Sequence, residues 1–435
     1  MEDFQQMYNG ERLQRNFQDA FWMKVEMDKN HLFVKIADNF NWDRVLGELK
    51  KFYCSNNGRP TVSTRLKVGL LIAKHLKKWS DEGVTEQLRE NLYLQYLCDI
   101  SPEDATRGVI NESSLTYFRK QIGEEGIKII EEEVERLLKD NGKSKGNKMT
   151  VDSTIVPENI EYPTDVHLLE KCRRKLVKVI DNACKELNTL KPRTYRNIGR
   201  KAFLTFIKFR KKGNKFRIKI QKKLIRFVHR NLNQAKELLS KVNNISDKVK
   251  QEVEVISKIL NQQKQVSQGK SVKHRIVSIH KPEVRPMVKG KFPNEVEFGQ
   301  KITLVKKGKG VFLSDSDNEN TSDTELLDKS VEFYERKFKK KPTAVITDRG
   351  YYSAKNVKKL KENGIKKLAI APKGKAKPEY TKESYYKKLC RERNAIEADI
   401  SLLKRKYGLD KNRYKNQNQW IRLGLIARNL KVALS

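Results

Sequence analysis

The chain has 435 residues, long enough for two or three domains, and its 93 Lys and Arg against 54 Asp and Glu give a formal net charge of +39 at pH 7. Its longest uninterrupted apolar run, Val68 to Ala73, is far too short to span a membrane, and its N-terminus lacks the pattern of a secretion signal, so we expect a soluble cytoplasmic protein. A positive surplus this large indicates a polyanionic partner, and nucleic acid is favoured over a membrane surface.

Helical periodicity begins after a short N-terminal segment. Residues 1–30 show no clean period and are predicted to form a tail. Apolar residues then recur at helical spacing, with a helix that starts at Ser63 or Thr64, a second helix capped by Ser80, and two shorter helices separated near a pair of glycines. This pattern predicts an all-helical module at 31–145 of the helix-turn-helix kind, for which DNA binding is one of several roles.

A basic segment follows and carries about half of the net charge. Between Lys171 and Arg230 there are 22 Lys and Arg against two acids, with six aromatic residues among them. The aromatic residues are typical of a helical core stripe, whereas so many unbalanced positive charges repel one another unless phosphates supply counter-charge. We therefore predict a basic helical insertion at 167–266 that grips DNA. The DNA contacts predicted there are Lys171, Arg173, Arg174, Arg193, Arg196, Arg200, Lys211 and Lys212.

Strand patterns lie on both sides of this insertion. They fall at Met149–Val156, 275–280, 299–308 and 310–317. A helix, a short apolar strand that ends at Asp348, another helix and another strand follow, and two helices end the chain. Strands that alternate with helices predict a mixed α/β domain, built from residues 146–166 and 267–435.

Three acids stand out by their positions in these elements. Asp152 lies in the first strand, Asp348 ends a later strand, and Glu397 lies on the penultimate helix. Each acid alone is more often a cap, a turn residue or part of a surface ion pair. Carboxylates gathered at one edge of a sheet repel one another unless a cation holds them, and oxygen ligands suit Mg²⁺ or Mn²⁺. Two such ions can activate an attacking oxygen and stabilise a leaving one in phosphoryl transfer.

Other metal and disulfide chemistry has no support in the sequence. The five cysteines form no CxxC pair and the six histidines form no HExxH motif, so neither a disulfide framework nor a zinc site is predicted. On the penultimate helix, a rotation of about 100° per residue places Arg393, Glu397 and Lys404 on one face, which is also typical of a solvated row of ion pairs. Asp399 falls on the apolar side, where a charge needs a partner that the sequence does not identify.

Three segments resemble a known family. "TVDST", "ITDRGYYS" and "RNAIEADISLLK" resemble the catalytic segments of DDE insertion-sequence transposases with a ribonuclease-H-like fold, in the branch whose third segment reads Tyr-x2-Arg-x3-Glu-x6-Lys. Arg393, Glu397 and Lys404 match that spacing, while Cys390 stands at the tyrosine position, so the role of that tyrosine is not carried over. The resemblance extends over the N-terminal helical module and covers nearly the whole chain from about residue 30.

The resemblance implies a DNA transposase that binds terminal inverted repeats, cleaves the DNA and joins its 3'-hydroxyl ends to target DNA. Asp152, Asp348 and Glu397 would hold two Mg²⁺ or Mn²⁺ ions per active site, and Arg393 and Lys404 would contact DNA phosphates or orient Glu397. The implied partners are double-stranded DNA, both inverted repeats and target, and a second copy of the chain in a synaptic homodimer. The implied location is the nucleoid of a bacterial cell.

Two alternatives share this fold: a transposase-derived DNA-binding protein without catalysis, and a structure-directed nuclease that cuts without joining. The three acids, with Arg393 and Lys404 at matching spacing, argue against the first. The sequence does not separate the second from a transposase, although the N-terminal helical module favours binding to specific DNA ends. The insertion contains no tryptophan, so a flipped base stacked on tryptophan, as in some relatives, is not expected there, and Tyr195 or a Phe would take that place. Whether Tyr351 and Tyr352 pack in the core or contact DNA stays open.

Overall fold

The computed structural model describes residues 26–53, 62–209, 213–288, 296–319, 321–374 and 378–435. Most of the predicted N-terminal tail and the predicted DNA contacts Lys211 and Lys212 lie outside these ranges. The chain divides into two compact units. Unit 1 comprises Met1–Pro157, Lys301–Asp317 and Thr321–Ser435, and unit 2 comprises Glu158–Gln300 and Asn318–Asn320.

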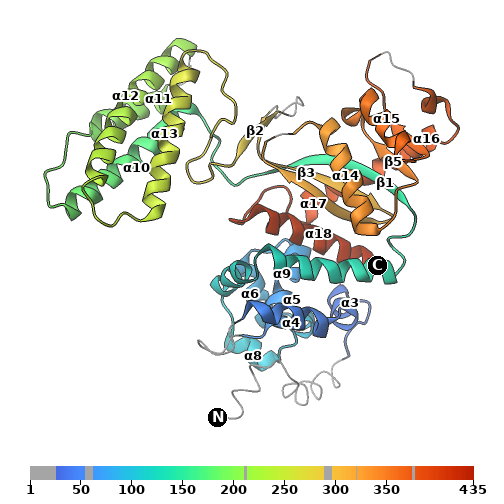
Figure 1. Ribbon diagram of the computed structural model, residues 1–435. Helices are drawn as coiled ribbons and strands as arrows, with labels where there is room; N and C mark the ends of the chain where they lie inside the picture. The colour runs from blue at the N-terminus through green and yellow to red at the C-terminus, as the bar shows by residue number, and fades with distance from the viewer. Residues whose placement is uncertain (1–25, 54–61, 210–212, 289–295, 320, 375–377) are drawn as a thin grey trace. The chain divides into compact units, whose positions relative to one another are not determined.

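The described elements of unit 1 before residue 141 are all helices (Figure 1). Their starts follow the predicted caps: Ser63 precedes the helix α5, and the hydroxyl of Ser80 accepts a hydrogen bond from the Gly83 N–H at the start of α6. The predicted break also occurs, because Gly123 adopts φ 59° and ψ −159° inside α9. The helices are α3 (Leu32–Asn39), α4 (Trp42–Leu49), η1 (Lys50–Phe52), α5 (Thr64–Lys77), α6 (Asp81–Glu90), α7 (Leu92–Cys98), α8 (Pro102–Arg107) and α9 (Glu112–Asp140).

A mixed sheet forms the second part of unit 1, in the strand order β4-β3-β1-β5-β6. β1 and β6 each pair in parallel with β5, whereas β4 pairs antiparallel with β3. This arrangement confirms the prediction of a mixed α/β domain. The strands are β1 (Lys148–Pro157), β3 (Val296–Lys307), β4 (Gly310–Asp317), β5 (Ala344–Thr347) and β6 (Lys367–Ile370).

Helices cover this sheet and connect it to the N-terminal helices. α18 runs beside α9 between the N-terminal helices and the sheet, and its side chains Trp420, Ile426 and Leu430 share one hydrophobic core with residues of α5 and α9 (Figure 1). The N-terminal helices are therefore anchored to the C-terminal end of the chain. The helices of this part are α14 (Asp323–Phe338), η2 (Arg349–Tyr351), α15 (Ala354–Glu362), η3 (Glu379–Lys382), α16 (Tyr386–Glu392), α17 (Asn394–Lys406) and α18 (Gln417–Ala433).

Unit 2 is mainly helical and has a hydrophobic core of its own. The strand predicted at 275–280 is wrong. Ile276 and Ile279 instead pack into the helical core, and the Ile276 N–H donates to the side-chain oxygen of Gln262 on α13. This apolar run therefore covers a helix and does not join the sheet. The elements are α10 (Asp165–Glu186), α11 (Arg196–Lys208), α12 (Asn214–Leu239), α13 (Asp247–Ser267) and β2 (Arg285–Val288), which pairs antiparallel with the start of β3.

No helix among the described residues combines the length and the apolar composition that crossing a bilayer requires.

Candidate active site

Two of the three predicted acids lie at matching positions on adjacent parallel strands. The register pairs Thr150 of β1 with Ile346 of β5, and Asp152 and Asp348 each follow these paired residues by two positions. Neighbouring strands run about 5 Å apart, so the two carboxylates extend from the same edge of the sheet. The four residues of β5 are buried and fix the position of this strand in the sheet. Asp348 follows directly after them, so the apolar strand holds this acid at the edge of the sheet.

A backbone N–H orients each of these carboxylates. Oδ1 of Asp152 accepts a hydrogen bond of 2.8 Å from the Ser153 N–H, and Oδ1 of Asp348 accepts one of 2.8 Å from the Gly350 N–H. Asp348 thereby caps the short turn η2, so it also plays the turn role that a strand-end aspartate most often has. In both residues, Oδ2 is not engaged by these bonds.

The pKa of Asp152 indicates that the other predicted residues lie nearby. Burial raises the pKa of Asp152 to about 6, from an ordinary value of 3.8. The negative charges of Asp348 and Glu397 raise it as well, while the Ser153 N–H and the charge of Arg393 act in the opposite direction. The structure therefore brings the three predicted acids and Arg393 within electrostatic range of one another.

Glu397 is held by Arg393 in this conformation. Nη1 of Arg393 lies 2.7 Å from Oε1 of Glu397, and the Glu397 side chain is 50% exposed. Arg393 stands at the junction of α16 and α17, and sequence periodicity missed the short helix α16. Lys404 is half-buried about two turns after Glu397 on α17. The Arg393 and Glu397 side chains thus meet on one helix face, as their spacing predicts.

A fourth carboxylate, Asp323, adjoins this site and was not singled out by sequence reasoning. It is the first residue of α14, and its Oδ1 lies 2.7 Å from Nζ of Lys301 on β3. A Cβ placed on Gly350 would stand 2.7 Å from Oδ2 of Asp323 and 3.0 Å from Oδ1 of Asp348. A side chain at position 350 would therefore collide with both carboxylates, which explains the glycine. The position of Asp323 at a helix start, six residues after the end of β4, is the signal that was available.

Tyr351 is a core residue, which answers for this tyrosine, though not for Tyr352, the question left open by the sequence. Its side chain is fully buried, and its hydroxyl forms a hydrogen bond with the hydroxyl of Ser153. Burial raises the pKa of Tyr351 well above its ordinary value, and the nearby charges of Asp323, Asp152 and Asp348 raise it as well. The phenol therefore remains protonated near neutral pH and is closed to direct contact with DNA.

The acids have the chemistry of a site for a divalent cation, but they are not yet arranged as one. Among the described residues, no group of three or more His, Cys, Asp or Glu side chains is placed to hold a metal ion. Asp152 and Asp348 provide hard oxygen donors at one sheet edge, and the raised pKa of Asp152 marks a place where a cation is favourable. Glu397 is engaged through Oε1 with Arg393.

Asp399 has a structural role. Its carboxylate is buried, with Oδ1 2.6 Å from Nη2 of Arg428 on α18, and Lys306 of β3 donates to its other oxygen. The partner that sequence analysis could not identify is therefore a pair of cations far away in the chain. This cluster ties α17, which carries Glu397, to the sheet and to α18.

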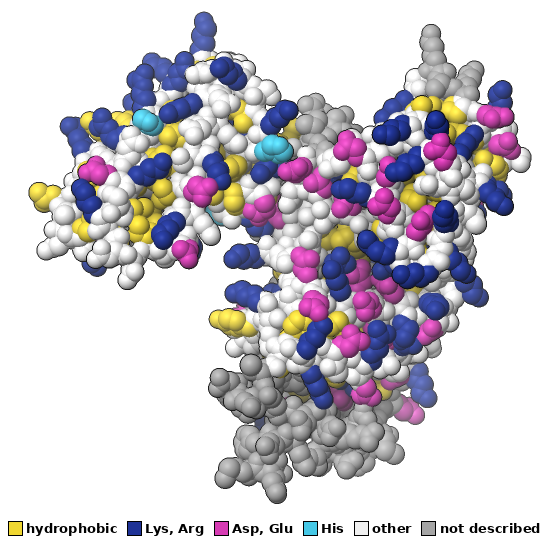
Figure 2. Space-filling view, in the orientation of Figure 1, with side chains coloured by type: hydrophobic (Ala, Val, Ile, Leu, Met, Phe, Trp, Pro, Cys, Tyr) yellow, Lys and Arg dark blue, Asp and Glu magenta, His cyan; other side chains and the backbone are white. Residues whose placement is uncertain are grey.

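The predicted DNA contacts of unit 2 do not all lie on its surface. Arg173 is only 3% exposed and makes a buried ion pair of 2.6 Å with Glu170, so its prediction as a DNA contact is corrected. Its stem also packs against Gly199 of α11. Lys171 is partly exposed and paired with Glu161, whereas Arg174, Arg193, Arg196 and Arg200 are exposed, Arg196 in an ion pair with Asp181. Lys and Arg side chains are spread over these helices (Figure 2).

Two of the exposed arginines of unit 2 flank one aromatic ring. The guanidinium carbons of Arg193 and Arg230 lie 4.7 Å and 4.6 Å from the ring centroid of Tyr195, which stacks on Phe227. Within the part of the chain that the structure describes, neither guanidinium has a carboxylate partner. The ring thus holds two positive charges near each other with their N–H groups free for an anion.

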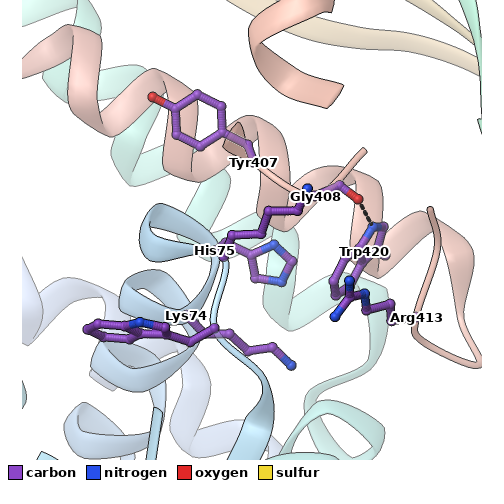
Figure 3. Close-up of a pocket in the computed structure, with 8 residues that line it drawn as sticks. Lys74, His75, Tyr407, Gly408, Arg413 and Trp420 are labelled. Atoms are coloured by element: carbon purple, nitrogen blue, oxygen red, sulfur yellow. Dashed lines mark hydrogen bonds between the residues drawn. The ribbon is translucent and has the colours of Figure 1, made fainter. Parts of the chain in front are cut away.

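A small pocket of unit 1 contains none of the three predicted acids (Figure 3). Lys74 in its wall is paired with Asp81 at 2.6 Å, and burial lowers the pKa of Lys74 to about 8. The indole N–H of Trp420 donates to the carbonyl of Gly408 at 2.7 Å. Lys74 and Trp420 are thus engaged with neighbouring protein groups. The lining residues are Lys74, His75, Lys78, Trp79, Tyr407, Gly408, Arg413 and Trp420.

Comparisons with known proteins find two matching families. Residues 22–121 match the transposase domain DUF772, and residues 280–430 match the transposase DDE domain, a range that includes Asp348 and Glu397 but not Asp152. The chain is also 34% identical over 151 residues to an uncharacterized protein, ORF8 in the nfe locus of Rhizobium meliloti. The aligned stretch covers 33% of this chain and 70% of that protein. No solved structure matches.

Proposed function

We propose that this chain, which belongs to the insertion-sequence transposases with a DDE domain, binds the terminal inverted repeats of its element, cleaves the DNA and joins the 3'-hydroxyl ends to target DNA. The observation that carries this proposal is the gathering of Asp152, Asp348 and Glu397 around one sheet edge. The two strand-borne acids occupy equivalent positions on parallel strands, which is an arrangement that packing alone does not require.

The three acids would hold Mg²⁺ or Mn²⁺, with two ions per active site. Such ions activate an attacking oxygen and stabilise a leaving oxygen during phosphoryl transfer. The chain's contribution is to fix the ligands: backbone N–H groups orient Asp152 and Asp348 through Oδ1 and leave Oδ2 for a cation. Burial of Asp152 further favours a nearby positive charge, because the isolated carboxylate is poorly solvated.

Arg393 and Lys404 would contact DNA phosphates near the cut. Arg393 holds Glu397 by an exposed i, i+4 ion pair, which typically contributes less than about 1 kcal/mol. A DNA phosphate that engages Arg393 would release Glu397 at little cost. Lys404 presents a point charge that suits a phosphate of the transferred strand. Both residues match the Arg-x3-Glu-x6-Lys spacing of the branch that the sequence resembles.

Unit 2 would supply much of the grip on the DNA ends. Its exposed arginines include Arg193 and Arg230, which are held on Tyr195 without a carboxylate partner and are suited to a backbone phosphate. The affinity for DNA should therefore fall steeply with salt. The ribonuclease-H-like fold, a synaptic homodimer and the domain boundaries at 31–145, 146–166, 167–266 and 267–435 belong to this proposal.

One observation favours a second candidate function. Glu397 is paired with Arg393, and the described residues form no complete metal site, as would suit a transposase-derived protein that binds DNA without cutting it. A nuclease that cuts without joining is the other alternative, and the products of the reaction distinguish it.

The experiment uses the purified chain, Mg²⁺ and a duplex that carries the inverted repeat flanking its gene, with a supercoiled plasmid as target. The wild type should cleave the duplex and join it to the plasmid. The Asp152→Asn, Asp348→Asn and Glu397→Gln variants should lose both steps while retaining DNA binding in a gel-shift assay. Normal joining by any of these variants would refute the assignment of the acids. Wild-type binding without cleavage would support the non-catalytic alternative, and cleavage without joining would support the nuclease.

A further inference from the structure

The turn after Asp348 and the strand that carries Asp152 are joined by one side-chain hydrogen bond. Tyr351 ends the turn η2, which Asp348 caps, and Ser153 directly follows Asp152 on β1. The two hydroxyls form a hydrogen bond in a buried setting. Two carboxylates that repel each other are therefore carried by segments that a neutral contact holds together.

The bonds on either side of this contact reach both carboxylates. The Ser153 N–H donates to Oδ1 of Asp152, and the Gly350 N–H, from the residue before Tyr351, donates to Oδ1 of Asp348. A shift of the Ser153 hydroxyl or of the Tyr351 ring would move the N–H that orients the adjacent acid. The contact thus belongs to a short chain of bonds that runs from one acid to the other.

Each partner in this contact is itself fixed. The carbonyl of Tyr351 accepts from the side-chain amide of Asn356 at 3.1 Å, and that amide also donates to the carbonyl of Thr324 at 2.8 Å. On the other side, the hydroxyl of Ser153 lies 3.4 Å from that of Thr303 on β3. Supporting bonds of this kind help to fix the backbone of Tyr351 and the hydroxyl of Ser153.

We propose that Tyr351 is a positioning residue of the active site: its hydroxyl binds Ser153 and sets the separation and orientation of Asp152 and Asp348. The inference rests on the proposed function, because it assigns a role within that site. The aromatic ring and the hydroxyl have different roles here. The ring belongs to the same hydrophobic core as Met149, Val151 and Leu326, whereas the hydroxyl is needed only for the register of the two acids.

The test compares two tyrosines of the same core that each lose only a hydroxyl. Tyr334 is also fully buried, and its hydroxyl donates to Oδ1 of Asn147 at 3.0 Å, without a bond to any of the three acids. Tyr351→Phe should lower the rate of cleavage and joining at saturating DNA about tenfold or more, with DNA affinity unchanged. Tyr334→Phe should leave that rate within twofold of the wild type, although both variants lose similar amounts of thermal stability.

A second variant and a second readout complete the design. Ser153→Ala should lower the rate as Tyr351→Phe does, and the double variant should be no slower than either single variant, because one contact is removed in all three. Binding of Mn²⁺ to the DNA-free chain, followed by electron paramagnetic resonance, should weaken in Tyr351→Phe and Ser153→Ala but not in Tyr334→Phe.

A Tyr351→Phe rate within twofold of the wild type, or full additivity with Ser153→Ala, would overturn the inference. Should Tyr351→Phe fail to fold, Ser153→Ala alone decides it, because an unchanged rate in that variant leaves the contact without a role. A wild-type chain that neither cuts nor joins DNA would instead contradict the proposed function itself.

Discussion

Replacing Asp152 by Asn should make the metal-free protein more stable at neutral pH while it abolishes activity. The pKa of Asp152 in the folded chain is about 6, above its ordinary value of 3.8. The folded chain therefore holds this proton more tightly than the unfolded chain, and ionisation of Asp152 reduces stability as the pH rises from about 4 to about 6. Above about pH 6 the whole cost is present, and Asp152→Asn removes it.

The magnitude follows from the shift in pKa. A shift of about two units corresponds to about 3 kcal/mol in the free energy of unfolding, and relaxation around the charge makes this an upper value. For a unit of this size, about 2 to 3 kcal/mol corresponds to a rise of roughly 5 °C in Tm. Below about pH 4, where Asp152 is protonated in both states, the difference between the two proteins should become small.

The assay is calorimetric unfolding of the wild type and Asp152→Asn in a chelating buffer between pH 4 and pH 8. The control is Asp247→Asn, which removes an acid that is 91% exposed and should show no such pH-dependent gain. Excess Mg²⁺ should then stabilise the wild type and not Asp152→Asn, since a ligand stabilises only the state that binds it. A variant that is no more stable than the wild type at pH 7.5, or a gain that is independent of pH, would refute this account.

Three further predictions concern separate parts of the molecule. Gly350→Ala places a Cβ 2.7 Å from Oδ2 of Asp323, so DNA joining should fall at least tenfold. Adding Asp323→Ala to the same chain should restore part of the joining activity. Normal joining by the Gly350→Ala variant alone would contradict this steric argument. Asp399→Asn leaves the buried Arg428 with less counter-charge, so the free energy of unfolding measured by chemical denaturation should fall by about 3 to 5 kcal/mol. A fall below about 1 kcal/mol would count against a stabilising role of the buried pair. Tyr195→Leu keeps the net charge but removes the ring against which two arginines lie, so DNA affinity measured by fluorescence anisotropy should fall severalfold. An unchanged affinity would mean that the arginines contribute only through the net charge and not through their position on the ring.

The sequence predicted those parts of the site that local rules determine. The apolar strand that ends at Asp348 and the strand that carries Asp152 are each local features, whereas the parallel pairing that brings the two acids to one edge joins residues 196 positions apart. The contact between Arg393 and Glu397 follows from helix geometry alone. Capping by Ser80 was equally local, because its hydroxyl accepts from the Gly83 N–H three residues further on, whereas Ser63 precedes α5 without a side-chain cap.

The remaining features depend on residues that are distant in the chain. The partners of Asp399 lie 93 and 29 positions away, so nothing near it in the sequence identifies them. Arg173 and Glu170 look like a surface pair at i, i+3, and only the packing of α10 in the core of unit 2 shows that they are buried. The apolar run at 275–280 has the pattern of a strand but finds its neighbours on α13, because burial against a helix satisfies the same side chains.

The most direct test of the central claim is to locate a bound divalent ion by the cuts that it makes in the protein backbone. Fe²⁺ would replace Mg²⁺ in the complex with end DNA, and ascorbate with peroxide would generate hydroxyl radicals at the metal. The account predicts cleavage near Asp152, Asp348 and Glu397 together, with loss of all three cuts in Asp152→Asn. Cleavage confined to the neighbourhood of Asp152 and Asp348, or cleavage elsewhere in the chain, would contradict the claim that these three acids form one site.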